Sequence, residues 1–203
     1  MADVAFWDRI ADRYAARAVG NETAYAGTLE RVRAWLRSDM SVMEIGCGTG
    51  TTALRLAGSV AHYLGTDLSG EMLRIARGRA AGVPVVSFEQ AAAETAGAGR
   101  RFDAICAFNL MHLVEDRGAV LAHVQDRLSP GGLFISKTPC LGHKPWLRPV
   151  VWGMQCFGKA PSVAHFLKVA EWEQELVQAG FDIVETGDYP AGLPNHFVVA
   201  RLP

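Results

Sequence analysis

Short β-type runs alternate with helix-type runs along most of this chain, and this alternation limits the fold more than any other feature. The β-type runs are VMEIG, HYLGTDL, VVSFEQ, FDAICAF, SPGGLFISKT, FDIVETGDY and HFVVARL. Most connecting segments have apolar residues at helical spacing, as at Val120, Leu121, Val124 and Leu128. Such alternation predicts right-handed βαβ units and an α/β fold whose mostly parallel sheet is covered by helices on both faces.

The two ends of the chain depart from this alternation. Two amphipathic helices are predicted before the first strand, over residues 6–14 and 25–36. The last two β-type runs are separated by PAGLPN, residues 190–195, which is too short for a helical crossover. We therefore expect these strands to pair antiparallel at one end of the sheet.

Length and charge narrow the classes of function. Half of the 203 residues are hydrophobic, which favours a single domain with a substantial core. Twenty basic and 21 acidic residues give a net charge of -1, without the basic excess typical of nucleic-acid binding. The longest uncharged run, residues 149–158, is far shorter than the roughly 18 apolar residues that span a bilayer. No nucleic-acid partner and no transmembrane segment are expected.

The N-terminal segment and the cysteines indicate a reducing compartment. Asp3, Asp8 and Arg9 interrupt the region where a secretion signal would be apolar, so a cytoplasmic location is expected. The cysteines form no CxxC pair and have no metal-ligand spacing, so we predict reduced thiols that mostly serve packing, and no metal site. They are Cys47, Cys106, Cys140 and Cys156.

The stretch GCGTG, directly after the first β-type run, has glycine at positions 46, 48 and 50. Glycine adopts torsions closed to other residues and lets a ligand approach closely, and the following helix offers free N–H groups. A tight turn is the simpler interpretation. Asp67 ends the second β-type run, where a carboxylate can accept both hydroxyls of a ribose. The dinucleotide fingerprint GxGxxG needs glycine at position 51, and Thr51 there counts against NAD.

Four stretches together resemble the class I S-adenosylmethionine (SAM)-dependent methyltransferases. VMEIGCGTG, LGTDLSGEML, FDAICAFNLMHLVED and LSPGGLFI resemble the successive motifs of that family in order and separation, over about residues 7–202. The opening FWDRIADRYAAR is similar to the N-terminal helix of small-molecule members, including those acting on quinones and lipids. The resemblance implies a Rossmann-like seven-stranded sheet, SAM as cofactor, and in-line methyl transfer to a small, apolar or thiol-bearing acceptor. S-, O-, N- and C-methylation stay open.

Carried over position by position, the resemblance implies a set of cofactor contacts. The glycines at 46, 48 and 50 approach the methionine and ribose parts of SAM, and Asp67 accepts the ribose hydroxyls. The implied cofactor-binding residues are Glu44, Gly46, Cys47, Gly48, Gly50, Asp67, Leu68, Met72, Ala92, Ala93 and Asn109.

The resemblance places the adenine end of SAM after the second strand and its methionine end near the first and fourth strands. Leu68 and Met72 flank the adenine in this comparison. Asn109, after the fourth strand, stands where the backbone meets the methionine amino group. Glu44 orders the loop or binds that amino group through water.

One position departs from the family pattern. Members often carry an acid after the third strand to accept the adenine amino group, and FEQAAAET places Ala92 there. Backbone groups of Ala92 and Ala93 are then expected to contact the adenine, with Gln90 or Glu94 nearby. Weaker cofactor binding is the alternative.

The candidates for a catalytic base are histidines and one tyrosine. His112 lies just past the fourth strand, near the expected active-site rim, although packing would also explain it. Tyr14 is on the first helix, which folds over the cofactor in similar enzymes, and is expected to line the site. A surface role is expected for His143 and His165, and His196 completes the set.

Residues 139–168 escape the alternation and are rich in Trp, Phe, Met, Pro and Gly. They are expected to lie over the carboxyl edge of the sheet, where open α/β sheets bind ligands, and to form an apolar acceptor pocket. A core or dimer surface is an alternative, and Arg148 and Lys159 would let the segment rest on a membrane. The chain is therefore expected to be one methyltransferase domain, 1–203, acting as a monomer or homodimer. Its expected parts are an N-terminal helical cap 1–40, a cofactor-binding core 41–138, a substrate-side insertion 139–168, and a last helix and β-hairpin 169–203.

Other enzyme classes fit less well. Methyltransferases of bases or protein amides often show Asn/Asp-Pro-Pro-aromatic after the fourth strand, and FNLMH does not match. The carboxylate cluster of metal-dependent catechol enzymes is not evident. A non-catalytic SAM-binding protein and an NAD-dependent oxidoreductase stay open as alternatives.

Overall fold

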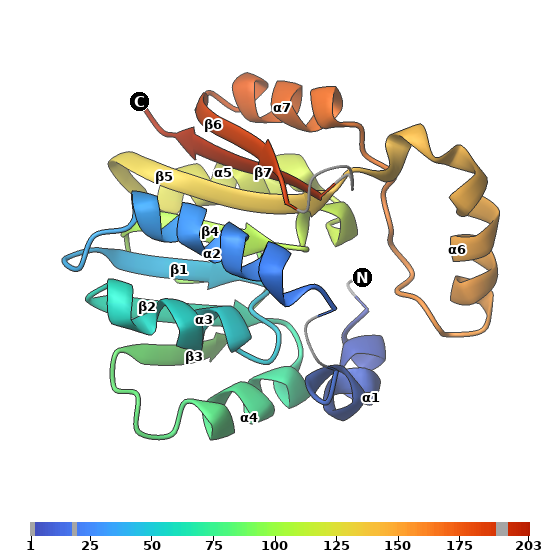
Figure 1. Ribbon diagram of the computed structural model, residues 1–203, viewed down its shortest axis with the longest axis horizontal. Coiled ribbons are helices and arrows are strands. Elements are labelled where there is room, and N and C mark those ends of the chain that lie inside the picture. Colours follow the sequence, from blue (N-terminus) through green and yellow to red (C-terminus); the bar gives the residue numbers. More distant parts are fainter. Residues whose placement is uncertain (1–2, 18–19, 190–194) are drawn as a thin grey trace.

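The computed structural model of the chain describes residues 3–17, 20–189 and 195–203 and is built around a seven-stranded sheet (Figure 1). The strand order is β3-β2-β1-β4-β5-β7-β6. The strands are β1 Ser41–Ile45, β2 His62–Asp67, β3 Val86–Gln90, β4 Phe102–Phe108, β5 Leu128–Pro139, β6 Asp182–Asp188 and β7 Asn195–Arg201. Strand β7 pairs antiparallel with both β5 and β6, while the other pairs are parallel. The predicted fold class is therefore confirmed, including the antiparallel last strand. Most of the predicted loop PAGLPN, residues 190–194, lies outside the described residues.

Side-chain caps begin three of the helices. Asn21, Ser69 and Asp116 each accept a hydrogen bond from the backbone N–H three residues on, which satisfies a donor that the helix leaves free. The helices are α1 Val4–Ala15, α2 Glu22–Trp35, α3 Thr51–Leu56, α4 Gly70–Arg79, α5 Arg117–Arg127, α6 Arg148–Cys156 and α7 Val169–Gln178. Short 3-10 helices are η1 Ala57–Ser59, η2 Met111–Leu113, η3 Leu141–His143 and η4 Pro145–Leu147.

The strands bury side chains on both faces of the sheet. Successive residues point to opposite faces, so Val42 and Cys106 pack with α2 and α3, whereas Met43 and Ile105 pack with α5 and α7. Figure 1 shows α2 and α3 in front of the sheet. On the other face, Trp172 of α7 is fully buried. Each face of the sheet is thus covered by a cluster of buried side chains.

The two N-terminal helices have different roles in packing. Helix α2 belongs to the core through its buried residues. Helix α1 instead packs on α4, where the Ser69 hydroxyl donates to Asp8 at 2.5 Å and the guanidinium of Arg74 contacts Asp12 at 3.0 Å. Within the predicted cap 1–40, helix α1 packs on α4, whereas α2 packs on the sheet.

Residues 140–168, which we call the arm, project from the end of β5 and carry α6 away from the sheet (Figure 1). Every residue of α6 is at least partly exposed. Trp152 is 68% exposed and Phe157 is 78% exposed. Three of the four cysteines are buried, in agreement with the expectation that they mostly serve packing, and Cys156 is exposed on α6. No helix within the described residues is long and apolar enough to cross a membrane.

Candidate active site

The three glycines after β1 all have positive φ, but for different physical reasons. Their φ angles are 68° at Gly46, 54° at Gly48 and 75° at Gly50. A Cβ at Gly46 would lie 2.8 Å from a Leu110 side-chain carbon, and one at Gly50 would lie 3.0 Å from the Cβ of Ala76. At Gly48 the nearest atom would be a Tyr14 ring carbon at 3.9 Å. Gly46 and Gly50 therefore permit close packing, whereas Gly48 leaves space above the backbone.

Asp67, the last residue of β2, holds this glycine corner in place. One carboxylate oxygen accepts the N–H of Gly48 at 2.8 Å and the other accepts the N–H of Ser69 at 2.9 Å. Burial raises the pKa of Asp67, and the two backbone N–H groups act against that rise. Each oxygen keeps a further lone pair, so the carboxylate can still accept hydrogen bonds from a ligand.

Glu44 of β1 is buried beneath the corner. The hydroxyl of Tyr63 donates to one of its carboxylate oxygens at 2.9 Å. Burial raises the pKa of Glu44 to about 7, although the Tyr63 hydrogen bond lowers it in part. At neutral pH this group is therefore present in both protonation states, and it can donate or accept a hydrogen bond.

A cavity of about 340 Å³ lies between α1, α2 and the carboxyl ends of β1, β4 and β5. The sheet reverses its order between β1 and β4, which is where open α/β sheets bind ligands. Among its lining residues are six that the sequence predicted: Tyr14, Glu44, Gly46, Cys47, Gly48 and Asn109.

Comparison with known proteins assigns this arrangement to a family. A family model for a methyltransferase domain matches residues 16–186. The chain belongs to the class I SAM-dependent methyltransferases.

Individual relatives agree with this assignment. The chain is 30% identical, over 72% of its length, to a ubiquinone biosynthesis O-methyltransferase from Azorhizobium caulinodans, of which it covers 60%. It thus spans about three fifths of that relative's length. A SAM-dependent methyltransferase from Mesorhizobium loti has a TM-score of 0.72 at 22% identity, with 88% of this chain and 97% of that one covered. Magnesium protoporphyrin IX methyltransferase from Synechocystis, with bound S-adenosylhomocysteine (SAH), has a TM-score of 0.72 at 20% identity, covering 98% and 93%. These two structures support the fold.

Several of the methyltransferase's predicted cofactor residues lie outside the cavity lining. Asp67 does not line the cavity itself, but its carboxylate accepts the N–H of Gly48, which does. The carbonyl of Leu68 accepts a hydrogen bond from Gln90 at 2.9 Å. Met72 of α4 is buried, with 2% of its surface exposed. The residues outside the lining are Gly50, Asp67, Leu68, Met72, Ala92, Ala93 and His112. Most residues predicted to contact the methionine end of SAM therefore line the cavity, whereas those predicted to contact the adenine do not.

Asn109 connects the ends of β4 and β5. It has φ 54° and is the one non-glycine residue with positive φ among those described. Asparagine tolerates this region better than most residues. Its N–H donates to the carbonyl of Lys137 at 2.8 Å. The turn after β4 is thereby fixed at the cavity wall.

His112 and His165 lie together on the side of the arm. The carbonyl of His112 accepts the N–H of His165 at 2.7 Å. Burial and the neighbouring His165 lower the pKa of His112 to about 4. Within the described chain, Nδ1 of His112 and Nε2 of His165 are buried and have no hydrogen-bond partner. The predicted surface role of His165 is wrong, because the chain returning from α6 places it against η2.

The other two histidines do not approach the cavity. His143 is exposed on the arm, as expected. His196 is buried at the start of β7, where Nε2 contacts Glu173 at 2.8 Å and Nδ1 contacts Asp188 at 3.3 Å. The contacts of His196 indicate a structural role.

Tyr14 lies over the corner from α1. Partial burial and the negative charge of Asp67 raise the pKa of its phenol. The hydroxyl is therefore protonated at neutral pH, which suits a hydrogen-bond donor better than a base.

Part of the cavity wall was not predicted from the sequence. Tyr25 and Thr28 of α2, Thr52 of α3 and Lys137 of β5 all line it. Tyr25 and Thr52 share a hydrogen bond of 2.9 Å between their hydroxyls. A lysine in the apolar run LFISKT was the available signal for Lys137, because a cation in such a strand needs a reason.

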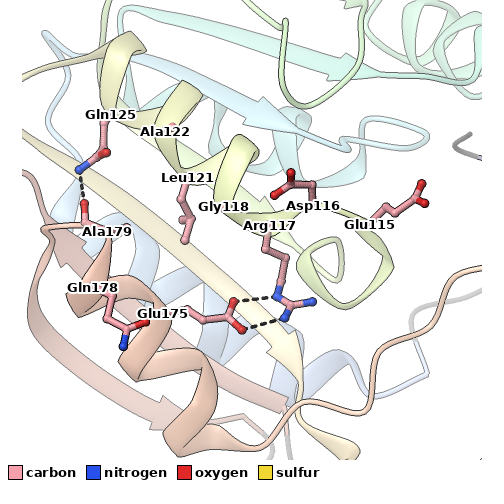
Figure 2. A pocket seen from close by; sticks show the side chains of 10 residues that line it. All are labelled: Glu115, Asp116, Arg117, Gly118, Leu121, Ala122, Gln125, Glu175, Gln178 and Ala179. Carbon is pink, nitrogen blue, oxygen red and sulfur yellow. Dashed lines mark hydrogen bonds and ion pairs between the residues drawn. The ribbon is translucent and has the colours of Figure 1, made fainter.

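A larger groove of about 640 Å³ lies between α5 and α7, on the opposite face of the sheet from α2 (Figure 2). Across the groove, Nε and Nη2 of Arg117 each donate a hydrogen bond of 2.7 Å to the carboxylate of Glu175. Figure 2 also shows Gln125 reaching the Ala179 carbonyl. These polar groups are paired with one another, and the groove shares no lining residue with the glycine corner.

Proposed function

We propose that this methyltransferase binds SAM at the glycine corner and transfers its methyl group to a small-molecule acceptor. The observation that carries the proposal is the cavity above Gly48, which Glu44 and Asn109 border at the point where the sheet order reverses. Bound SAM supplies a methyl group that its sulfonium charge already activates. The task left to the protein is alignment, which can contribute about 7–11 kcal/mol.

The cofactor contacts follow from the remaining hydrogen-bonding capacity of the site. Asp67 keeps lone pairs for ribose hydroxyls after accepting two backbone N–H groups. Glu44 and the turn at Asn109 are proposed to contact the methionine amino group. Leu68 and the backbone at Ala92 are proposed for the adenine end.

His112 is the proposed base where an acceptor needs one, because its Nδ1 has no hydrogen-bond partner in the described chain. Its pKa of about 4 makes it a weak base at pH 7, and it lies outside the cavity lining, so this role requires the acceptor to reach it from the side of the arm. Tyr14 is proposed to donate a hydrogen bond rather than to remove a proton, because its pKa is raised. Thiol acceptors depend on a base least, since their pKa lies near 8.5.

The acceptor is proposed to be a small, largely apolar molecule that carries a hydroxyl or a thiol. The relatives named ubiquinone biosynthesis O-methyltransferases favour the hydroxyl. A separate hollow of about 310 Å³ lies beside α6, lined in part by Arg148, Trp152, His165 and Phe166.

The test is incubation with methyl-labelled SAM and separate fractions of phenols, quinols, thiols, amines and lipids. We expect label in one small-molecule fraction, with release of SAH and loss of both signals in Asp67→Ala. Label in RNA or protein alone would refute the small-molecule acceptor. Binding of SAM without SAH release in any fraction would favour the non-catalytic alternative, and a thermal shift with NAD but not SAM would favour an oxidoreductase.

We also propose that the arm rests on an anionic membrane surface. Residues 139–170 contain no Asp or Glu, and their basic residues are Lys144, Arg148, Lys159 and Lys168, in a chain of net charge -1. Exposed large apolar side chains accompany these cations at Trp146, Val150, Trp152, Met154 and Phe157. Apolar side chains flanked by cations are typical of segments that lie in the bilayer interface.

Vesicle sedimentation tests the membrane contact. We expect binding to phosphatidylglycerol vesicles but little to phosphatidylcholine vesicles, and loss of binding in Trp152→Ser with Phe157→Ser. Val177→Ser on α7, where Val177 is 57% exposed, is the matched control and should bind as the wild type does. Absence of vesicle binding, with a dimer that the same double substitution dissociates, would make the arm a dimer interface instead.

The proposed location is the cytoplasm, since the four cysteines are free thiols. Recovery of the protein from cells in a disulfide-bonded form would contradict this.

A further inference from the structure

Lys137 reaches into the cavity from β5, two residues before the strand ends. Its ammonium group donates to the hydroxyl oxygen of Thr28 at 2.9 Å. Thr28 in turn donates its hydroxyl proton to the Ala24 carbonyl at 2.9 Å, so its oxygen is left to accept. Helix α2 thus holds the ammonium group at a fixed place on the cavity wall.

The charge of Lys137 has no counterion in the described part of the chain. Lys137 makes no salt bridge there, and burial lowers its pKa without any neighbouring charge to oppose the shift. Glu44, the carboxyl group in the cavity lining, accepts the hydroxyl of Tyr63 instead. A partly buried cation is costly unless it is paired, and Lys137 has two further N–H donors.

Two arginines also line the cavity, Arg17 and Arg79. Arg17 is exposed beyond the end of α1, and Arg79 is already engaged. The guanidinium of Arg79 donates to Thr49 at 2.9 Å and to the carbonyl of Ala15 at 2.8 Å. Arg79 therefore ties α1 to the corner and α4. Lys137 is left as the cation with free donors on the β5 side of the cavity.

We propose that Lys137 binds the carboxylate of the methionine half of SAM and so selects ligands that carry the amino-acid end. The inference rests on the proposed function. In the ligand, the amino group and the carboxylate are attached to the same carbon. With the amino group beside Asn109, the carboxylate must lie within a few bonds of it, and the N–H of Asn109 is bonded to the backbone of Lys137 itself. The side chain of Lys137 supplies the charge that this end of the ligand needs.

Calorimetry with two ligands tests the inference. SAH carries the amino-acid end, and 5′-methylthioadenosine has the same adenosine thioether without it. Lys137→Met should weaken SAH binding at least roughly tenfold, because a hydrogen bond to a charged group is lost, and should leave methylthioadenosine binding unchanged. Lys159→Met, which removes an exposed cation from the arm, should change neither affinity.

Two further measurements separate this role from a structural one. Thr28→Val keeps the charge but frees the ammonium group, so SAH binding should weaken by less than in Lys137→Met. Urea unfolding of Lys137→Met without ligand should show no loss of stability, since replacing an unpaired buried charge with an apolar group is neutral or stabilising.

Unchanged SAH affinity in Lys137→Met would overturn the inference. Equal weakening of both ligands, or a marked loss of stability, would also overturn it. Failure of the wild type to bind either ligand would instead refute the proposed function.

Discussion

At the glycine corner the backbone itself forms the site, whereas on the arm exposed side chains form the surface. Gly48 has φ 54°, and its N–H is held by Asp67 at 2.8 Å. On the arm, Trp152 and Phe157 are 68% and 78% exposed. The corner fixes the position of a ligand before it binds, and the arm offers apolar area with few fixed contacts.

This difference explains why the methyl donor is better defined than the acceptor. The corner needs three residues in the left-handed conformation and a carboxylate hydrogen-bonded to one of them, so few sequences can form it and few ligands fit it. An apolar surface with scattered cations is compatible with many sequences and many partners. Variants that act on one region only should therefore separate ligand binding, stability and surface contact.

The largest expected contrast is between two tryptophans. Trp172→Ala in the core should lower the free energy of unfolding by about 3–5 kcal/mol, because it removes a fully buried ring that packs on Phe134. Trp152→Ala on the arm should change it by less than about 0.5 kcal/mol. Urea unfolding measures both. A large loss in Trp152→Ala would mean that the arm is packed in solution.

A smaller effect should appear in the pH dependence of stability. The pKa of His112 is about 4 in the folded chain and about 6.5 when unfolded, so below pH 6.5 the unfolded state binds a proton that the folded state does not. Stability is therefore lost as pH falls from 6.5 towards 4, by about 2 kcal/mol at pH 5. His112→Gln should lack this loss.

Urea unfolding of both proteins at pH 5 and pH 7 checks the prediction. Glu44, whose raised pKa of about 7 makes stability fall as pH rises from 4.5 to 7, is present in both and cancels in the comparison. An identical pH dependence in the two proteins would mean that His112 is accessible and titrates normally.

Two glycines with similar backbones should differ in ligand binding. Gly48 and Gly131 have φ of 54° and 75°, and a Cβ at Gly131 would meet nothing within 4 Å. Alanine at either position should cost about 1–2 kcal/mol of stability through the left-handed conformation. Calorimetry should show weaker SAH binding for Gly48→Ala alone. Equal SAH affinities would mean that the ligand does not approach Gly48.

Features set by local sequence could be predicted well. The strand runs and the short last connection each depend on neighbours in the chain. Gly48 and Asp67 could be predicted to lie near each other because Gly48 follows β1 and Asp67 ends the adjacent parallel strand β2.

Features that depend on packing between distant segments could not be predicted. Lys137 and Thr28 are 109 residues apart and meet only because α2 lies across β5. His165 was expected at the surface, but the return from α6 brings its N–H to the carbonyl of His112. Apolar composition alone did not show that α6 would stand clear of the core.

The most direct test of the account is SAH binding by Asp67→Ala beside Asp103→Ala. Both carboxylates accept a backbone N–H at 2.8 Å, Asp67 from Gly48 and Asp103 from Ser41, but Asp103 lies at the opposite end of its strand from the cavity. Asp67→Ala should weaken SAH binding at least roughly tenfold, while Asp103→Ala should bind SAH as the wild type does. Equal affinities in the two variants would contradict the placement of the cofactor at the glycine corner.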